Sequence, residues 1–113
     1  MEHRLTTSLL ISALRKRAEQ SGGVCTVINR GDADAGGLLL ICAEKGCISA
    51  LLELAYDPAG KMIWRHCLPQ ITDEQQKFEN YLMKRRKTDG DLWVIELDIP
   101  AAERFAADFV ALD

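Results

Sequence analysis

Apolar positions recur at helical spacing near the two ends of the chain and at strand spacing between them. Residues 6–20 predict a helix with Leu10, Leu14 and Ala18 on one face, ended by two glycines at 22–23. Strand-like segments follow at residues 24–29, 38–42, 47–56 and 62–68. The segment 38–42 is apolar on both faces, so we expect it to lie in the centre of a sheet.

A second helix, a fifth strand and a short third helix complete the pattern. Residues 72–75 form a capping box before a helix with the apolar stripe Phe78, Tyr81 and Leu82, and residues 91–99 alternate as a strand. This order predicts an α+β fold: a mostly antiparallel five-stranded sheet with two or three helices packed on one face, a two-layer sandwich. The helical connection into residues 91–99 can add one parallel pair.

The composition predicts one ordinary globular domain spanning residues 1–113. Hydrophobic residues make up 48% of the chain, charged residues 27%, and the net charge is −3. These values exclude a disordered chain, and the acidic balance disfavours a protein that coats nucleic acid or an anionic membrane. No apolar run approaches the ~20 residues of a membrane-spanning helix. We therefore expect a cytoplasmic protein without membrane contact.

The cysteine spacing agrees with a reducing compartment. No cysteine belongs to a Cys-x-x-Cys pair or has a histidine at zinc-finger spacing. We interpret all of them as buried reduced thiols, with a structural zinc site or a reactive thiol as the alternatives, and we expect no cofactor. They are Cys25, Cys42, Cys47 and Cys67.

The segment from Arg30 to Gly36, RGDADAG, is the most distinctive part of the chain. It places two carboxylates and two glycines between two apolar strands, where we expect a hairpin loop. Asp32 and Asp34 can bind a cation, a donor-rich ligand or an arginine of a partner, or they can cap their own turn. An EF-hand calcium loop is excluded, since two of its ligand positions would hold Gly36 and Ala43.

The candidate binding site centres on this loop and on the strand at residues 91–96. Arg30 can pair with either aspartate or with Glu96, and a partly buried carboxylate beside an arginine is typical of functional sites. Trp93 is interpreted as a core residue, or as a stacking platform if it lies at a pocket mouth. The sequence contains no nucleophile turn, phosphate loop or dinucleotide fingerprint, so we assign no catalytic residue. The candidate residues are Arg30, Gly31, Asp32, Asp34, Gly36, Trp93 and Glu96.

The RGDADAG segment, the arginine-bearing N-terminal helix and the later DLWVIE segment occur in an order that resembles a known family. It is an uncharacterised alphaproteobacterial family, domain of unknown function 1491. The resemblance covers about residues 4–96, and Gly90 stands where a proline is expected. The resemblance implies a bacterial cytoplasmic setting and carries no mechanism.

We therefore expect a small non-enzymatic binding or adaptor domain with a protein partner, and a homodimer through the last helix or an edge strand is a further option. One alternative is a small metal-dependent enzyme using Asp32, Asp34 and Glu96. Another is an RNA-associated protein using the basic residues 15–17 and 84–87. The enzyme requires acids that converge in a cleft, and the RNA binder requires both basic runs on one face. The adaptor requires an exposed apolar or mixed patch beside the loop.

Overall fold

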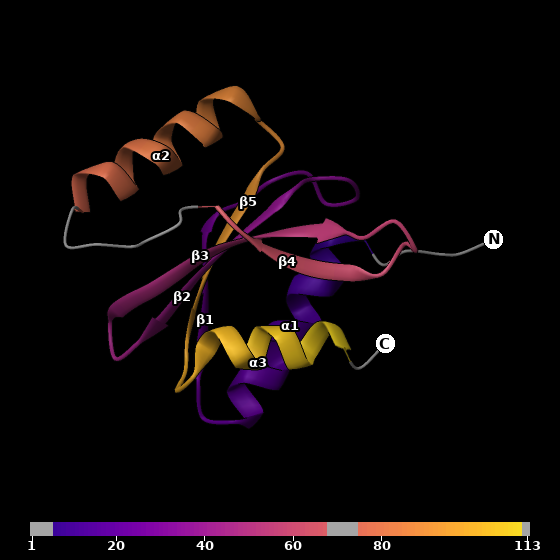
Figure 1. Cartoon of the computed structure of the whole chain (residues 1–113), viewed down its shortest axis with the longest axis vertical. Helices are drawn as coiled ribbons and strands as arrows, with labels where there is room; N and C mark the ends of the chain where they lie inside the picture. The colour runs from indigo at the N-terminus through magenta and orange to yellow at the C-terminus, as the bar shows by residue number, and fades with distance from the viewer. Residues whose placement is uncertain (1–5, 68–74, 112–113) are drawn as a thin grey trace.

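The predicted order of helices and strands is confirmed. The computed structural model describes residues 6–67 and 75–111 (Figure 1). Residues 72–74 of the predicted capping box lie outside the described residues. In chain order the elements are α1 (Thr7–Gln20), β1 (Val24–Asn29), β2 (Leu38–Glu44), β3 (Cys47–Tyr56), β4 (Met62–His66), α2 (Gln75–Thr88), β5 (Trp93–Asp98) and α3 (Ala102–Ala111).

The sequence signals at both ends of α1 act as expected. The Thr6 side chain accepts a hydrogen bond from the backbone N–H of Leu9 at 3.3 Å, which caps the first turn. Gly22 has a φ of 84°, and the N–H of Gly23 donates to the Ala18 carbonyl oxygen at 2.8 Å. This bond across a left-handed glycine ends the helix and turns the chain into β1.

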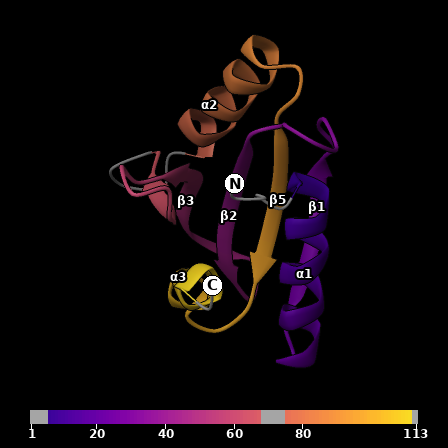
Figure 2. The ribbon, with the colours of Figure 1, turned by 90° about the vertical axis from the view of Figure 1, so that its right-hand side faces the viewer.

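The sheet is mixed rather than mostly antiparallel, because its central pair is parallel. The strand order is β1-β5-β2-β3-β4. The pairs β1/β5, β2/β3 and β3/β4 are antiparallel, whereas β2 and β5 run parallel. The parallel pair arises because the chain leaves the β4 edge, forms α2 and re-enters the sheet between β1 and β2 (Figure 2).

The insertion of β5 also corrects the predicted hairpin around residues 30–36. Strands β1 and β2 are consecutive in the chain, but each pairs with β5 and they do not pair with each other. The segment between them is therefore a connection that spans the end of β5. The sequence pattern could not reveal this, since β5 lies more than fifty residues further along the chain.

Helices cover both faces of the sheet, so the predicted two-layer sandwich with helices on one face is wrong. Residues of α1 and α3 pack in one apolar cluster with the face that carries Leu40, Ile95 and Leu97. Phe78, the buried residue of α2, packs in a second cluster on the opposite face. Figure 1 shows this arrangement, with α2 on one side of the strands and α1 and α3 on the other.

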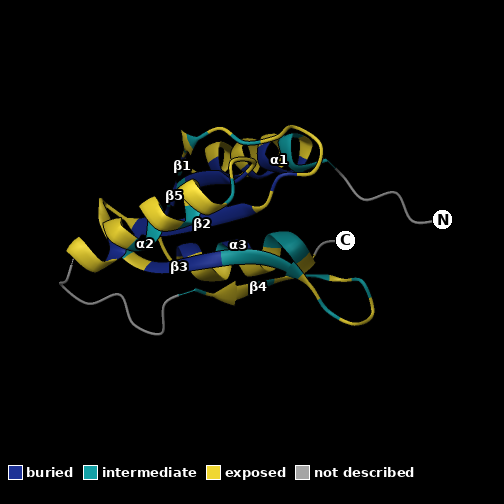
Figure 3. Ribbon diagram, turned by 90° about the horizontal axis from the view of Figure 1, so that it is seen from above, coloured by how far each residue is buried: buried dark blue, intermediate teal, exposed yellow. Residues whose placement is uncertain are grey.

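Strands β2 and β5 form the centre of the molecule. Six of the seven residues of β2 are buried, which confirms the central position predicted from its apolar run. The burial colours of Figure 3 show β2 and β5 as the dark core between more exposed helices. No helix in residues 6–67 and 75–111 is long and apolar enough to cross a membrane.

Candidate binding loop

The two aspartates of the loop have different roles. The Asp32 carboxylate accepts hydrogen bonds from the backbone N–H groups of Asp34, at 3.2 Å, and Ala35, at 2.8 Å. These bonds cap the turn, so Asp32 stabilises its own loop. The side chain of Asp34 is exposed and makes no hydrogen bond or ion pair in the described part of the chain.

Both glycines of the loop are required by a close approach to β5. A Cβ atom at either Gly31 or Gly36 would overlap the carbonyl oxygen of Asp91, and one at Gly31 would also come within 2.7 Å of Trp93. The backbone N–H of Asp32 donates to the same carbonyl oxygen at 3.0 Å. The loop therefore wraps closely around one backbone carbonyl of the segment that leads into β5.

Trp93 holds the loop through a hydrogen bond from its buried indole ring. Its side chain is 3% exposed, and its indole Nε1–H donates to the carbonyl oxygen of Asp32 at 2.7 Å. The Arg30 guanidinium carbon lies 5.6 Å from the centroid of the Trp93 ring, within the range of a cation–π contact. Arg30 forms no ion pair with Asp32, Asp34 or Glu96 among the described residues. The indole, not a carboxylate, is its neighbour.

Three residues that were not predicted as site residues also hold the loop. The Thr7 hydroxyl donates to the Gly36 carbonyl oxygen at 2.7 Å, and the N–H of Ser8 donates to the Ala33 carbonyl oxygen at 3.1 Å. The Asn29 amide donates to the Leu92 carbonyl oxygen at 2.8 Å. The polar run at residues 6–8, which marks the start of α1, was the available sequence signal for the first two.

Glu96 lies apart from the loop acids. It occupies the middle of β5, where its register partners are Thr26 on β1 and Ile41 on β2. By strand alternation its side chain leaves the face opposite to Trp93. The described residues contain no group of three or more histidine, cysteine, aspartate or glutamate side chains placed to hold a metal ion. The structure thus brings together six of the seven predicted site residues and leaves Glu96 outside.

Cys25, Cys42 and Cys67 lie in environments that oppose ionisation of the thiol. Burial raises the pKa of Cys25 to about 11 and that of Cys42 to about 12, and burial also raises the pKa of the half-buried Cys67. All four cysteines are free. Cys47 is exposed, which corrects the prediction that every thiol is buried. Protonated thiols at neutral pH are poor nucleophiles and poor metal ligands.

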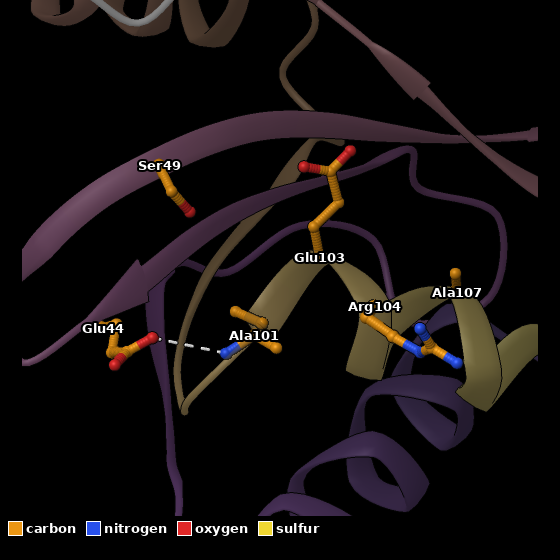
Figure 4. Close-up of a pocket in the computed structure, with 7 residues that line it drawn as sticks. Glu44, Ser49, Ala101, Glu103, Arg104 and Ala107 are labelled. Carbon is orange, nitrogen blue, oxygen red and sulfur yellow. Dashed lines mark hydrogen bonds between the residues drawn. The ribbon is translucent and has the colours of Figure 1, made fainter.

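An open pocket of about 560 Å³ lies at the other end of the sheet (Figure 4). It is bordered by Glu44 at the end of β2, by Ser49 on β3 and by the first turns of α3. Glu44 accepts a hydrogen bond from the N–H of Ala101 at 3.3 Å, and Glu103 lies 2.6 Å from His66 Nε2. Both acids already have partners, and no sequence motif had marked them.

The two basic runs lie on different faces of the molecule. Residues 15–17 belong to α1, which packs with one apolar cluster, and residues 84–87 belong to α2, which packs with the other. Arg85 is moreover engaged by Glu53, with Nη2 to Oε2 at 2.7 Å. The shared basic face on which an RNA-binding role depends is therefore absent from the described residues.

Similar proteins agree with this architecture. A crystal structure of a DUF1491 family protein from Caulobacter crescentus matches with a TM-score of 0.74 and 27% identity, over 85% of this chain and 89% of the other. An NMR structure of a DUF1491 family protein from the same organism gives 0.71 and 26%, over 86% and 87%. A solution structure from A. tumefaciens, at 0.64 and 20% over 86% and 87%, shows a similar fold.

The family model described as "Protein of unknown function (DUF1491)" matches residues 5–107. No curated protein matches the sequence. The matched span includes the loop at residues 30–36 and the residues of β5 that it contacts. It also includes α1, α2 and the part of α3 up to residue 107. The chain therefore belongs to the DUF1491 family, whose function is unknown.

Proposed function

We propose that this chain is a non-enzymatic protein-binding domain that contacts its partner through the loop at residues 30–36. The single observation that supports this is that the residues that fix the loop differ from the charged residues that it exposes. Gly31, Asp32 and Gly36 hold it against β5, while Arg30 and Asp34 remain exposed. A loop fixed from within presents its charges at little entropic cost, which favours recognition.

The exposed side chains of the loop carry both signs of charge. Arg30 supplies a cation and Asp34 supplies an anion, and both residues are exposed. Their complement is a protein surface with an acidic group facing Arg30 and a basic group facing Asp34.

The alternatives receive less support from the geometry. A metal-dependent enzyme needs Asp32, Asp34 and Glu96 to converge, but Asp32 binds its own backbone and Glu96 leaves the other face of β5. The free thiols fit a reducing compartment, so we place this binding role in the bacterial cytoplasm.

The test is affinity capture from bacterial lysate with two matched double variants. Arg30→Gln with Asp34→Asn removes one positive and one negative charge from the loop. Arg104→Gln with Asp108→Asn removes the same charges from an exposed pair on α3, where the side chains are 83% and 73% exposed. We expect the loop variant to lose a protein that the wild type and the α3 variant both retain, with melting temperatures unchanged. Identical captured proteins for all three forms would contradict the proposal.

A further inference from the structure

The two edges of the sheet differ in how they are protected. Strand β4, at one edge, carries Arg65 and His66 among its five residues, and both side chains are exposed. Strand β1, at the other edge, has the sequence VCTVIN, without a charge or a proline. Charged residues and prolines are the usual devices that keep an edge strand from pairing with another chain.

The exposed side of β1 is apolar. Cys25 and Val27 pack with the cluster beneath α1, so Val24 and Thr26 point to the opposite face, and Ile28 follows as an exposed residue near the end of the strand. On that face α2 packs with residues of β2, β3 and β5 and leaves β1 uncovered. Val24 is 59% exposed and Ile28 is 48% exposed. Two large apolar side chains thus flank an exposed threonine along an edge that pairs with β5 alone among the described strands.

We propose that β1 is a dimerisation edge, at which a second copy of this chain pairs antiparallel around a two-fold axis at Thr26. The strand is self-complementary in this register. Val24 of each copy lies opposite Ile28 of the other, and the two threonines face each other on the axis. Shifting the register by one residue would set inward-facing side chains against outward-facing ones, so the pattern selects this pairing.

The charges around β1 permit this contact. On the α1 side, Arg15 and Glu19 form an ion pair at 3.4 Å and both act electrostatically on Cys25. This ion pair carries no net charge, so it adds no net repulsion between two copies. On the opposite side, Glu96 pairs with Thr26 across one strand spacing. The two Glu96 residues would then be three spacings apart, about 14 Å, where salt screens their repulsion.

The bulge in β1 limits the extent of the pairing. The register of β1 against β5 shifts between Val27 and Asn29, so the regular ladder of this strand is interrupted at Ile28. A bulge bends the strand and confines the intermolecular ladder to residues 24–28. A ladder this short predicts a dimer that dissociates on dilution and leaves the loop at residues 30–36 accessible on each copy.

The decisive experiment is sedimentation of the full chain between about 1 µM and about 1 mM, with variants at the axis. Thr26→Arg and Thr26→Glu each place like charges opposite one another. We expect each to raise the dissociation constant by at least about tenfold, whereas an equal mixture of the two should restore a heterodimer. Thr26→Val and, at the other edge, Ile63→Arg should dimerise like the wild type.

Two outcomes would overturn the proposal: a wild-type chain that stays monomeric throughout, or a dimer that survives Thr26→Arg. Val24→Lys provides a second test away from the axis, and circular dichroism verifies that each variant is folded. Arg30→Gln with Asp34→Asn should leave the dimer intact. Loss of partner capture and loss of dimerisation are therefore separable results.

Discussion

At both ends of strand β5 an aspartate carboxylate holds a neighbouring connection, but the two connections are packed differently. At its N-terminal end, the Asp32 carboxylate binds two backbone N–H groups of the loop at residues 30–36. At its C-terminal end, the Asp98 carboxylate binds the N–H groups of Lys45 and Gly46 in the β2–β3 turn, at 2.8 and 2.9 Å. Near each end of β5, an aspartate carboxylate thus accepts hydrogen bonds from two backbone N–H groups of a connecting segment.

The ends differ in how closely the chain is packed. At the loop end, two glycines enclose the Asp91 carbonyl oxygen and leave no room for a side chain. At the turn end, Gly46 has a φ of 80° and open space around it, and the pocket beside α3 lies next to Glu44. The loop is therefore held by close backbone packing in addition to hydrogen bonds, whereas the turn is held by hydrogen bonds with open space around its glycine. An exposed acid is available to a partner only where backbone groups do not already engage it, as at Asp34.

The largest effect should come from filling the space at the loop end. Gly36→Ala places a Cβ against the Asp91 carbonyl oxygen, so one of the two backbone segments must shift. We expect a loss of about 3 kcal/mol, the upper part of the range for overpacking. Gly46→Ala should lose only about 1 kcal/mol, from its left-handed backbone. Gly90→Ala, with open space around it, is the control. Equal losses at Gly36 and Gly46, measured by urea unfolding, would contradict the comparison.

Alkaline pH should weaken the turn half of β5 in preference to the loop half. Cys25 and Cys42 are the register partners of Leu97 on either side of β5. Burial raises the pKa of Cys42 from 9.0 to about 12, so the unfolded chain loses this proton first. The contribution of the thiol to stability is complete below about pH 9 and is lost as the pH rises toward 12. The loss is about 1.4 kcal/mol per pH unit for each such thiol.

The measurement is the free energy of unfolding between pH 8 and pH 10.5, followed by hydrogen exchange of the amides of β5. Cys42→Ala should have a shallower pH dependence than the wild type, although it is less stable at neutral pH. Cys47→Ala is the control, because its thiol is exposed. A wild-type slope that Cys42→Ala leaves unchanged would show that other groups cause the alkaline loss.

The two tryptophans provide a matched pair of smaller effects. Trp93 donates its indole N–H to the Asp32 carbonyl oxygen at 2.7 Å, and Trp64 donates to the Ala106 carbonyl oxygen of α3 at 2.9 Å. Trp93→Phe should cost about 2 kcal/mol, since the ring is buried and its acceptor then lacks a partner. Trp64→Phe should cost about 1 kcal/mol, because Trp64 is only half-buried. Thermal unfolding of both variants is the measurement, and Trp93→Phe should have the lower melting temperature. The opposite order would contradict the prediction.

The elements were predictable from sequence because their signals are local. Apolar spacing places α1 and β2, and the glycines at 22–23 end the first helix as expected. The insertion of β5 between β1 and β2 was not predictable, since strand pairing depends on contacts between distant segments. The same limit applied to the site. The loop was recognisable as a motif, but its hydrogen bond to the Asp91 carbonyl oxygen could not be predicted without the position of β5.

The smallest effects should separate the aspartates. Asp98→Ala should cost about 1 to 2 kcal/mol, because two backbone N–H groups distant in the chain lose their acceptor. Asp32→Ala should cost about 1 kcal/mol, as for loss of a helix cap, because its bonds are local and exposed. Asp34→Ala should change stability by less than about 0.5 kcal/mol, because its carboxylate binds nothing in the described residues.

This series tests both the comparison and the proposed function. Thermal unfolding resolves the three variants, since 1 kcal/mol shifts the melting temperature of a domain of this size by about 4 °C. Asp34→Ala should then abolish partner capture at full stability, whereas Asp32→Ala should reduce capture only as far as it loosens the loop. If Asp34→Ala were as destabilising as Asp32→Ala, both acids would be structural, and the exposed charge at the loop tip would no longer support a binding role.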